Sequence, residues 1–561
     1  MNKLAPLFVG TALSSLMLPG QAADPPKPYG AVPTPQQVNW QRMEFYGFIH
    51  FGLNTFTGRE WGYGDENPQI FNPTDFNASE IVETFKKGGM KGMIYTAKHH
   101  DGFCAWPTKS TEHNITKTPW KNGKGDVVKE FALACKKHGI KFGTYLSPWD
   151  RNHAEYGKEG YLKAYYQQIR ELLSNYGPVF EIWFDGANGG DGYYGGAREK
   201  RNIGNAEKYY NFEKIVEMIR SIQPNCIIWG AGHYGDARWG GSEKGHVNYP
   251  HWSTVGLNGG GGGTGKRGGE RWVPAEGDTT INHSGWFWHQ GQASRVKSPE
   301  ELMQVWFDSV GRGANLILNV AADKTGKLDP ADVKSLMEFK ELRDKLYAKN
   351  FALGATATAS QTRGNDKKFS PSNMTDGNMD TYWAVEDDNL TPSAVITLPK
   401  PATFDVSDCA NKSAWASVWT PSTSTLSSRA NGSASTTEEK PSATRSCAGL
   451  TAPSPPRSCA CASRAARQRP ASLNSPCSAS LQEPSARPSS AAATTWSSWR
   501  TVRTKSSTRR TEANPRPGPP SIRREPNSAK AELSRHAASL PTASSAPSAR
   551  QNSASAKPDG K

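Results

Sequence analysis

Short apolar runs alternate with amphipathic segments along the chain from about Gln41 to Lys349. An apolar run of roughly four to eight residues, bounded by turn-forming residues, is typical of a buried parallel strand. Runs of this kind predict strands over Phe45–Phe51, Gly92–Thr96, Lys141–Leu146, Val179–Phe184, Cys226–Trp229 and Asn315–Val320.

The segments between these runs have the period of helices. Asp126–His138 places its apolar residues on one face and stops at Gly139, which favours a helix with a glycine cap. Tyr161–Tyr176 and Ala206–Ile222 show the same pattern. Repeated βα units predict an α/β fold, a (β/α)8-like TIM barrel, rather than an antiparallel sandwich. The sixth and seventh strands cannot be placed, because Gly240–Gly285 is long, Gly-rich and aromatic.

The pattern changes after residue 350. Small and β-forming residues alternate over Ala352–Ser360, and Asn373–Trp383 is a turn-rich acidic loop that ends in aromatic residues. These segments resemble the opening third of a discoidin-type (F5/8 type C) β-sandwich, a common carbohydrate-binding module. The resemblance implies a truncated module over residues 350–406, which would expose unpaired strand edges.

After Val406 the chain is rich in Ser, Ala, Thr, Arg and Pro and nearly lacks Ile and Phe. This composition predicts a disordered, low-complexity basic tail over residues 407–561. When the reading frame is shifted over Lys412–Thr444, one consistent choice of synonymous codons yields a string that alternates like β-strands. That string resembles the missing continuation of the discoidin module. We therefore hypothesise that the frame slips near Val406 and that the tail carries no evolved function.

The tail also accounts for the net charge of +15. Residues 407–561 contain 22 Lys and Arg against 8 Asp and Glu, so the rest of the chain is almost neutral. A basic segment that has no ordered scaffold, and no element that could enter a groove of a nucleic acid, does not favour nucleic-acid binding. Cys104, Cys135 and Cys226 precede the tail and are scattered, which does not suggest a disulfide framework.

The N-terminus predicts export. Met1–Lys3 is a short basic start, an apolar stretch runs from Leu4 to about Leu18, and small residues follow up to Ala23. This order is typical of a secretory signal peptide over residues 1–23. The apolar stretch is too short for a membrane span, so we expect a secreted or periplasmic protein.

One carboxylate stands at the end of an apolar run, because Asp185 follows Val179–Phe184 directly and precedes Gly186. An α/β barrel places its catalytic residues at the C-terminal ends of its strands. The alternative interpretation is an Asp that caps a turn in a βα loop. Asp185 alone does not decide between the two, so the other strand ends matter.

Polar and aromatic segments follow the other predicted strands or fill the Gly-rich region. They are Gly47–Gly52, Thr96–Phe103 with Trp106 close behind, Thr144–Asp150, Arg238–Gly245, Trp272–Asp278 and Gly285–His289. Such side chains suit a sugar, because aromatic faces cover its C–H surface while polar groups bond its hydroxyls. Glycosidic cleavage needs two carboxylates, one to protonate the leaving oxygen and one to meet the developing oxocarbenium ion.

The histidines have alternative interpretations. A lone His50 inside an apolar strand is often a satisfied core histidine. His99 and His100 could ligate a metal, but adjacent residues on an extended segment point to opposite sides. Neither an H-E-x-x-H helix nor a Cys/His pair set accompanies them. We therefore expect no metal site. Cleavage by two carboxylates also requires no organic cofactor.

The motifs FIHFG, KHHDGF and WFDGA, in this order and spacing, resemble the α-L-fucosidases of glycoside hydrolase family 29. The resemblance covers the predicted catalytic domain, residues 36–349. It implies a (β/α)8-like barrel and a retaining reaction through a covalent fucosyl-enzyme, with Asp185 as the nucleophile. The residues expected to bind substrate, from the resemblance or from their place beside these motifs, are His50, Glu60, Trp61, His99, His100, Trp106, Tyr145, Trp183 and Trp286.

The second carboxylate, the acid/base, has two candidates. Glu243 in RWGGSEKG resembles the W-x-G-N-E-x-G segment that bears the general acid in one branch of the family, although Ser242 departs from its Asn. Glu276 in WVPAEGD is the rival, and Glu243 is favoured. Arg238 and Trp239, beside Glu243, are expected to touch the aglycone.

The sequence therefore predicts an exo-acting α-L-fucosidase that hydrolyses terminal α-linked L-fucose from glycans or oligosaccharides. The segments around Glu243 and Glu276 favour α-1,3 and α-1,4 linkages, with α-1,2 or broad specificity still open. The alternative function is a non-catalytic, lectin-like carbohydrate-binding protein. Asp185 with two candidate Glu partners argues against that alternative. Oligomeric state stays undetermined.

Overall fold

The computed structural model describes residues 22–28, 30–259, 262–389, 391–404 and 406–410, together with four later strands, β16 to β19. All of these residues belong to one compact unit, Met1–Ala471. The predicted signal segment therefore lies outside the described residues, except for its last two positions. No helix in the described ranges has the length and apolar character needed to cross a membrane.

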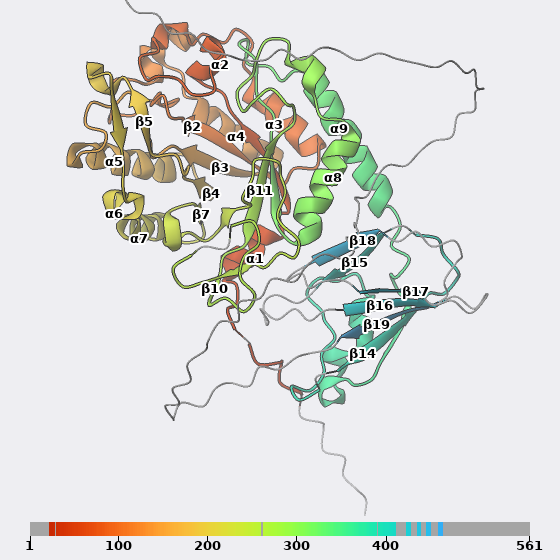
Figure 1. Cartoon of the computed structure of the whole chain (residues 1–561). Helices are drawn as coiled ribbons and strands as arrows, with labels where there is room; N and C mark the ends of the chain where they lie inside the picture. The colour runs from red at the N-terminus through yellow and green to blue at the C-terminus, as the bar shows by residue number, and fades with distance from the viewer. Residues whose placement is uncertain are drawn as a thin grey trace, which may run out of the picture. The chain divides into compact units, whose positions relative to one another are not determined.

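A nearly closed sheet of parallel strands forms the centre of the catalytic domain (Figure 1). Its order is β7 (Ile227–Trp229), β4 (Val179–Trp183), β3 (Lys141–Leu146), β2 (Gly92–Lys98), β1 (Phe45–Ile49), β12 (Asn315–Asn319), β11 (Ala275–Thr280) and β8 (Arg238–Trp239). A parallel bridge between Trp229 and Ala237 joins the two ends of the sheet. The predicted (β/α)8-like barrel is confirmed.

Helices cover the outside of this sheet (Figure 1). They are α3 (Ala78–Lys87), α4 (Val127–His138), α5 (Glu159–Asn175), α7 (Phe212–Ile222), α8 (Pro299–Ser309) and α9 (Pro330–Tyr347), with the short α6 (Ala206–Tyr210) beside α7. Helix α1 (Pro35–Gln41) instead lies at the N-terminal end of the barrel, where its Trp40 joins the interior cluster, and α2 (Leu53–Thr57) lies in the loop after β1. In α4 the Asp126 side chain accepts from the N–H of Lys129, and Gly139 ends the helix in the left-handed region. The single helix predicted over Ala206–Ile222 is wrong, because Asn211, at φ 53°, separates α6 from α7.

The two strands that the sequence could not place are β8 and β11. Strand β11 is buried along most of its length although its sequence is AEGDTT, with two carboxyl groups. The carboxyl groups of Glu276 and Asp278 accept hydrogen bonds from the indole N–H groups of Trp183 and Trp239, respectively. An apolar run therefore could not reveal this strand.

Two of the three hydrophobic clusters in the described residues contain most of the buried apolar side chains. The larger one lies between the strands and the helices. The smaller one fills the barrel and is mostly aromatic, with Trp40, Tyr46, Phe48, Tyr145, Trp183 and Trp229 among its members. Because these rings close the interior, the chemistry is confined to the C-terminal ends of the strands.

Short antiparallel strands lie outside the barrel. A hairpin of β5 (Gly189–Gly192) and β6 (Glu199–Asn202) follows β4, and β9 (Thr254–Val255) pairs with β10 (Arg271–Trp272) in the Gly-rich region.

The C-terminal part holds a sheet in the order β13 (Thr356–Ala359), β14 (Ser393–Thr397), β19 (Ser458–Ser463), β16 (Ser422–Ser427) and β17 (Ser435–Glu438). A second pair is β15 (Val406–Ala410) with β18 (Arg445–Gly449). The predicted tail thus contains short strands up to Ser463, and the remainder of it lies outside the described residues.

Candidate active site

Asp185 lies two residues after the end of β4, at the C-terminal end of the barrel. The Tyr145 hydroxyl donates to its Oδ2 at 3.1 Å, and the backbone N–H of Ala187 donates to its Oδ1 at 2.7 Å. Burial, and then Asp185 itself, raise the pKa of Tyr145 well above its ordinary value, so Tyr145 remains a donor. Asp185 is only partly buried, and the neighbouring Gly186 is exposed.

Three histidines lie beside this carboxylate. His50 follows β1, and His99 and His100 follow β2. The ring centroids of His50 and His99 are 5.6 Å apart, and those of His99 and His100 are 4.2 Å apart. The expectation that His99 and His100 point to opposite sides is therefore wrong. The chain stops being extended after Lys98 and turns at His100, which turns both rings to one side.

All three imidazoles are buried and neutral. Burial lowers the pKa of His50 to about 3 and that of His100 to about 4, and it lowers the pKa of His99 well below its ordinary value. Asp185 opposes this shift at His100 without overcoming it. At neutral pH the cluster therefore offers hydrogen-bonding nitrogens rather than positive charge.

Aromatic rings enclose the cluster. Trp183 stacks on Tyr145, with centroids 5.2 Å apart, and on Trp229 at 3.6 Å. Trp286 lies 5.2 Å from the His50 ring, and Trp61, which is 53% exposed, meets the His100 ring edge-on at 5.1 Å. Faces of this kind suit the apolar side of a sugar.

The Glu60 carboxylate binds the loop that contains Trp286, Phe287 and His289. Its carboxylate accepts from the N–H groups of Trp286 at 2.8 Å and Phe287 at 3.2 Å. His289 Nε2 lies 2.5 Å from the same carboxylate. Glu60 therefore holds the loop that carries Trp286 against the cluster.

Residues 29–341 match the α-L-fucosidase family. The chain belongs to the α-L-fucosidase family. It is 39% identical over 373 residues to α-L-fucosidase 1 of Arabidopsis thaliana, an alignment that covers 64% of this chain and 70% of the plant protein. The enzyme is thus a glycoside hydrolase with hydrolytic α-L-fucosidase function, and the resemblance seen in its motifs is confirmed.

Solved structures agree with this assignment. The fucosidase resembles a glycoside hydrolase 29 member from a rumen bacterium, with 36% identity, a TM-score of 0.67, and coverage of 80% of this chain and 79% of that one. It also resembles a Ruminococcus gnavus GH29 fucosidase in complex with fucose, at 30% identity and a TM-score of 0.71, covering 79% and 94% of the two chains.

The two acid/base candidates of the fucosidase have opposite environments. Glu243 is exposed, in the turn that follows β8. Glu276 has no exposed surface, and it accepts from the Tyr46 hydroxyl and, at 2.8 Å, from Trp183 Nε1. Burial raises the pKa of Glu276 to about 7. Burial, and then Glu276, also raise the pKa of Glu181 well above its ordinary value. The Glu181 and Glu276 carboxyl groups therefore favour sharing a proton inside the barrel.

The fucosidase does not bring every predicted residue to this end. Trp106 is fully buried, and its Nε1 donates to Glu171 of α5 at 2.9 Å, on the helical side of the sheet. Arg238 donates to backbone carbonyls of the Gly-rich region, including those of Trp252 at 2.8 Å and Val273 at 3.0 Å. Trp239, in contrast, ends β8 and is 45% exposed, and its Nε1 donates to Asp278 at 2.8 Å.

Other residues of the site were not singled out by the sequence. They include Phe48, Trp149, Trp229, Phe287 and Asn319, which contact the histidines or the predicted aromatic residues. Each of them lies within, or shortly after, a strand or motif that the sequence did reveal. Their position near a predicted strand end could therefore have identified these residues as part of the site. Their residue type alone could not.

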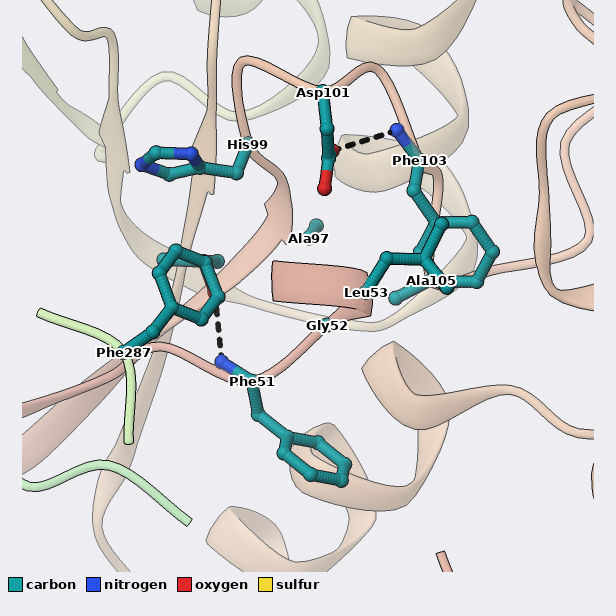
Figure 2. A pocket seen from close by; sticks show the side chains of 10 residues that line it. Phe51, Gly52, Leu53, Ala97, His99, Asp101, Phe103, Ala105 and Phe287 are labelled. Atoms are coloured by element: carbon teal, nitrogen blue, oxygen red, sulfur yellow. Dashed lines mark hydrogen bonds between the residues drawn. The ribbon is translucent and has the colours of Figure 1, made fainter. Parts of the chain in front are cut away.

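A small pocket lies next to His99 and is lined on the opposite side by Phe51 and Leu53 (Figure 2). Asp101 faces it, with Oδ1 accepting from the N–H of Phe103 at 2.9 Å. Burial, and then Glu66, raise the pKa of Asp101 to about 8. Across the described ranges, no group of three or more His, Cys, Asp or Glu side chains could hold a metal ion.

Proposed function

We propose that this fucosidase is an exo-acting, retaining enzyme in which Asp185 attacks the anomeric carbon of a terminal L-fucose. The observation that carries the proposal is the position of Asp185. Its carboxylate stands at the open end of the barrel, held by Tyr145 and by the N–H of Ala187, beside three neutral histidines. A carboxylate fixed by two donors and open on one side suits attack on a bound sugar.

The acid/base in this proposal is Glu243. Its exposed turn after β8 leaves its carboxyl group accessible to a leaving oxygen. Glu276 is sealed within the barrel beneath Trp183, so a proton from it has no route to the substrate. In a fucose complex we expect the Asp185 and Glu243 carboxyl groups at the separation of about 5–5.5 Å typical of retaining glycosidases.

Replacing Glu243 with Ala should lower kcat/KM for a fucosylated oligosaccharide by about 10²–10⁴-fold, the usual contribution of a positioned general acid. An aryl fucoside with a good leaving group should lose much less, because it needs little protonation. With the aryl fucoside, azide should restore turnover of Glu243→Ala and yield fucosyl azide. Steady-state kinetics on both substrates, with product analysis, measure all three effects.

Glu276→Gln is the matched control. Glutamine keeps an acceptor for Trp183 Nε1, and we expect its kcat/KM to stay within about threefold of the parent, with no response to azide. The proposal fails if Glu276→Gln shows the leaving-group dependence and azide rescue while Glu243→Ala does not.

The substrate subsite in this proposal comprises His50, His99, His100, Tyr145, Trp183 and Trp286, with Glu60 holding the Trp286 loop. Trp61 and Trp239 are exposed indoles that suit the rest of a glycan. We expect faster cleavage of α-1,3- and α-1,4-linked fucose than of α-1,2-linked fucose. A linkage-resolved activity panel measures this preference, and equal or reversed rates contradict it.

The remaining organisation is proposed from sequence. It comprises a signal peptide over residues 1–23 with export to the periplasm or the exterior, a catalytic domain over 36–349, and a truncated discoidin-like module over 350–406. The reading frame slips near Val406 in this scheme, so the basic tail has no function of its own. Resequencing codons 400–412 tests the slip, and an intact frame there refutes it.

A further inference from the structure

The three buried histidines share a feature that the proposed catalytic roles do not use. Each holds its Nδ1 atom against a polar side chain, and backbone groups fix the orientation of that side chain. A neutral imidazole carries its proton on one ring nitrogen only, and the partner of Nδ1 determines which one. The surrounding chain therefore determines the tautomer of each ring.

Asn319, at the end of β12, is the partner of His50. Its Oδ1 lies 2.8 Å from His50 Nδ1 and 3.2 Å from the backbone N–H of His50, while its Nδ2 donates to the Trp286 carbonyl at 2.7 Å. A backbone N–H only donates and a carbonyl only accepts, so the amide cannot be reversed. Asn319 therefore presents an acceptor to Nδ1, and His50 carries its proton there.

Ser147 is the partner of His100. Its hydroxyl donates to the Trp149 carbonyl at 2.8 Å, and its Oγ lies 2.7 Å from His100 Nδ1. Because the single hydroxyl proton goes to the carbonyl, Oγ accepts from the ring. His100 therefore also carries its proton on Nδ1.

His99 has the opposite arrangement. The Nδ2 group of Asn54 lies 3.4 Å from His99 Nδ1 and donates to the Glu60 carbonyl at 3.2 Å. Because the Glu60 carbonyl only accepts, the atom of the Asn54 amide that faces it, and that also faces His99 Nδ1, is the nitrogen. Nδ1 of His99 is therefore an acceptor, and its proton lies on Nε2.

The Nε2 atoms of the three histidines are left without a partner in the part of the protein that the structure describes. None of them has a hydrogen-bond partner within the described ranges, and none is among the fully buried polar atoms that lack one. The rings are nonetheless almost completely buried. Because each Nε2 atom is unpaired among the described residues and not fully buried, it is the ring nitrogen left for a ligand of the proposed subsite.

We propose that Asn319, Ser147 and Asn54 are positioning residues that set the hydrogen-bond polarity of the fucose pocket. His50 and His100 each present an acceptor through Nε2, and His99 presents a donor. Two sugar hydroxyls then donate to the cluster and one accepts from it. This inference rests on the proposed function in one respect, namely that the ligand in the pocket is fucose.

The first test is ¹⁵N NMR of the full-length enzyme labelled at its 12 histidines, without substrate at pH 7. Protonated and unprotonated ring nitrogens have well-separated ¹⁵N shifts, and single His→Gln variants assign the three rings. We expect the proton on Nδ1 in His50 and His100 and on Nε2 in His99. The reverse tautomer at His50 or at His99 overturns the proposal.

The second test compares the same substitution at two positions of β12. Asn319→Leu removes the acceptor for His50, so we expect its proton to move to Nε2 and kcat/KM for an aryl fucoside to fall about tenfold. Asn315→Leu is the matched control, because Asn315 is also buried and donates to a tryptophan carbonyl, that of Trp40, at 2.8 Å. We expect the control to leave the His50 tautomer and kcat/KM nearly unchanged.

Equal losses in both variants with an unchanged His50 tautomer would show that Asn319 only fills space, and the proposal would be wrong. Failure of the proposed function is distinguishable, since the tautomers are measured in the free enzyme. Correct tautomers in a protein that does not cleave fucosides would refute the function alone.

Discussion

Replacing Asp185 with Asn should lower kcat for an aryl α-L-fucoside by at least about 10³-fold, while the enzyme stays folded and binds fucose. Loss of the nucleophile prevents the covalent intermediate from forming, and such losses lower kcat by several orders of magnitude. Asparagine has the size of aspartate and keeps an oxygen for the Tyr145 hydroxyl, so the expected effect is on chemistry rather than on packing. Steady-state kinetics, thermal unfolding and fucose titration measure the three quantities.

The control is Asp191→Asn, which makes the same change at an exposed position in the hairpin after β4. We expect its kcat to stay near that of the parent. A 2-fluoro-fucosyl reagent should label the parent enzyme on the peptide that contains Asp185. A label on another peptide, or full activity of Asp185→Asn, removes Asp185 from the nucleophile role.

Replacing Lys98 with Met should lower the free energy of unfolding by about 3–5 kcal/mol, because it leaves a buried carboxylate without its counterion. Lys98 Nζ donates to Asp150 Oδ2 at 3.2 Å and to the Tyr161 hydroxyl at 2.9 Å, and both charged side chains are buried. Burial raises the pKa of Asp150, but Lys98 and His153 together more than offset this and hold it below its ordinary value. Urea unfolding at neutral pH measures the loss.

The pH dependence of this effect has a definite sign. In the parent the depressed pKa of Asp150 contributes stability above the ordinary aspartate range, and that contribution is lost as the pH falls through the folded-state pKa. In Lys98→Met the pKa of Asp150 rises, so the deficit should be largest near neutral pH and shrink in acid. The double variant Lys98→Met/Asp150→Asn should recover part of the loss.

An exposed ion pair provides the comparison. Lys334 and Glu338 are paired on the surface of α9, and Lys334→Met should change the free energy of unfolding by less than about 0.5 kcal/mol. If Lys98→Met lowers the free energy of unfolding no more than Lys334→Met does, the buried ion pair does not stabilise the fold as proposed.

The sequence determined the architecture and the location of the chemistry. Apolar runs of strand length revealed β1, β2, β3, β4, β7 and β12, because these strands are buried on both faces. The same runs placed Asp185, His99 and His100 after strand ends and His50 near the end of its strand, and parallel strands bring such ends together. The three family motifs in their order were sufficient to indicate an α-L-fucosidase.

Only the tertiary structure decided what each polar residue faces. The apolar pattern could not reveal β11, since Glu276 and Asp278 are bonded to rings inside the barrel. Likewise, the sequence grouped Trp106 with the sugar-binding residues, whereas the fold turns it towards α5. The partners of His50, His99 and His100 come from distant parts of the chain or from a later turn. Local sequence encodes which elements form, but burial and hydrogen-bond partners depend on contacts between segments far apart in the chain, and those contacts exist only once the barrel is assembled.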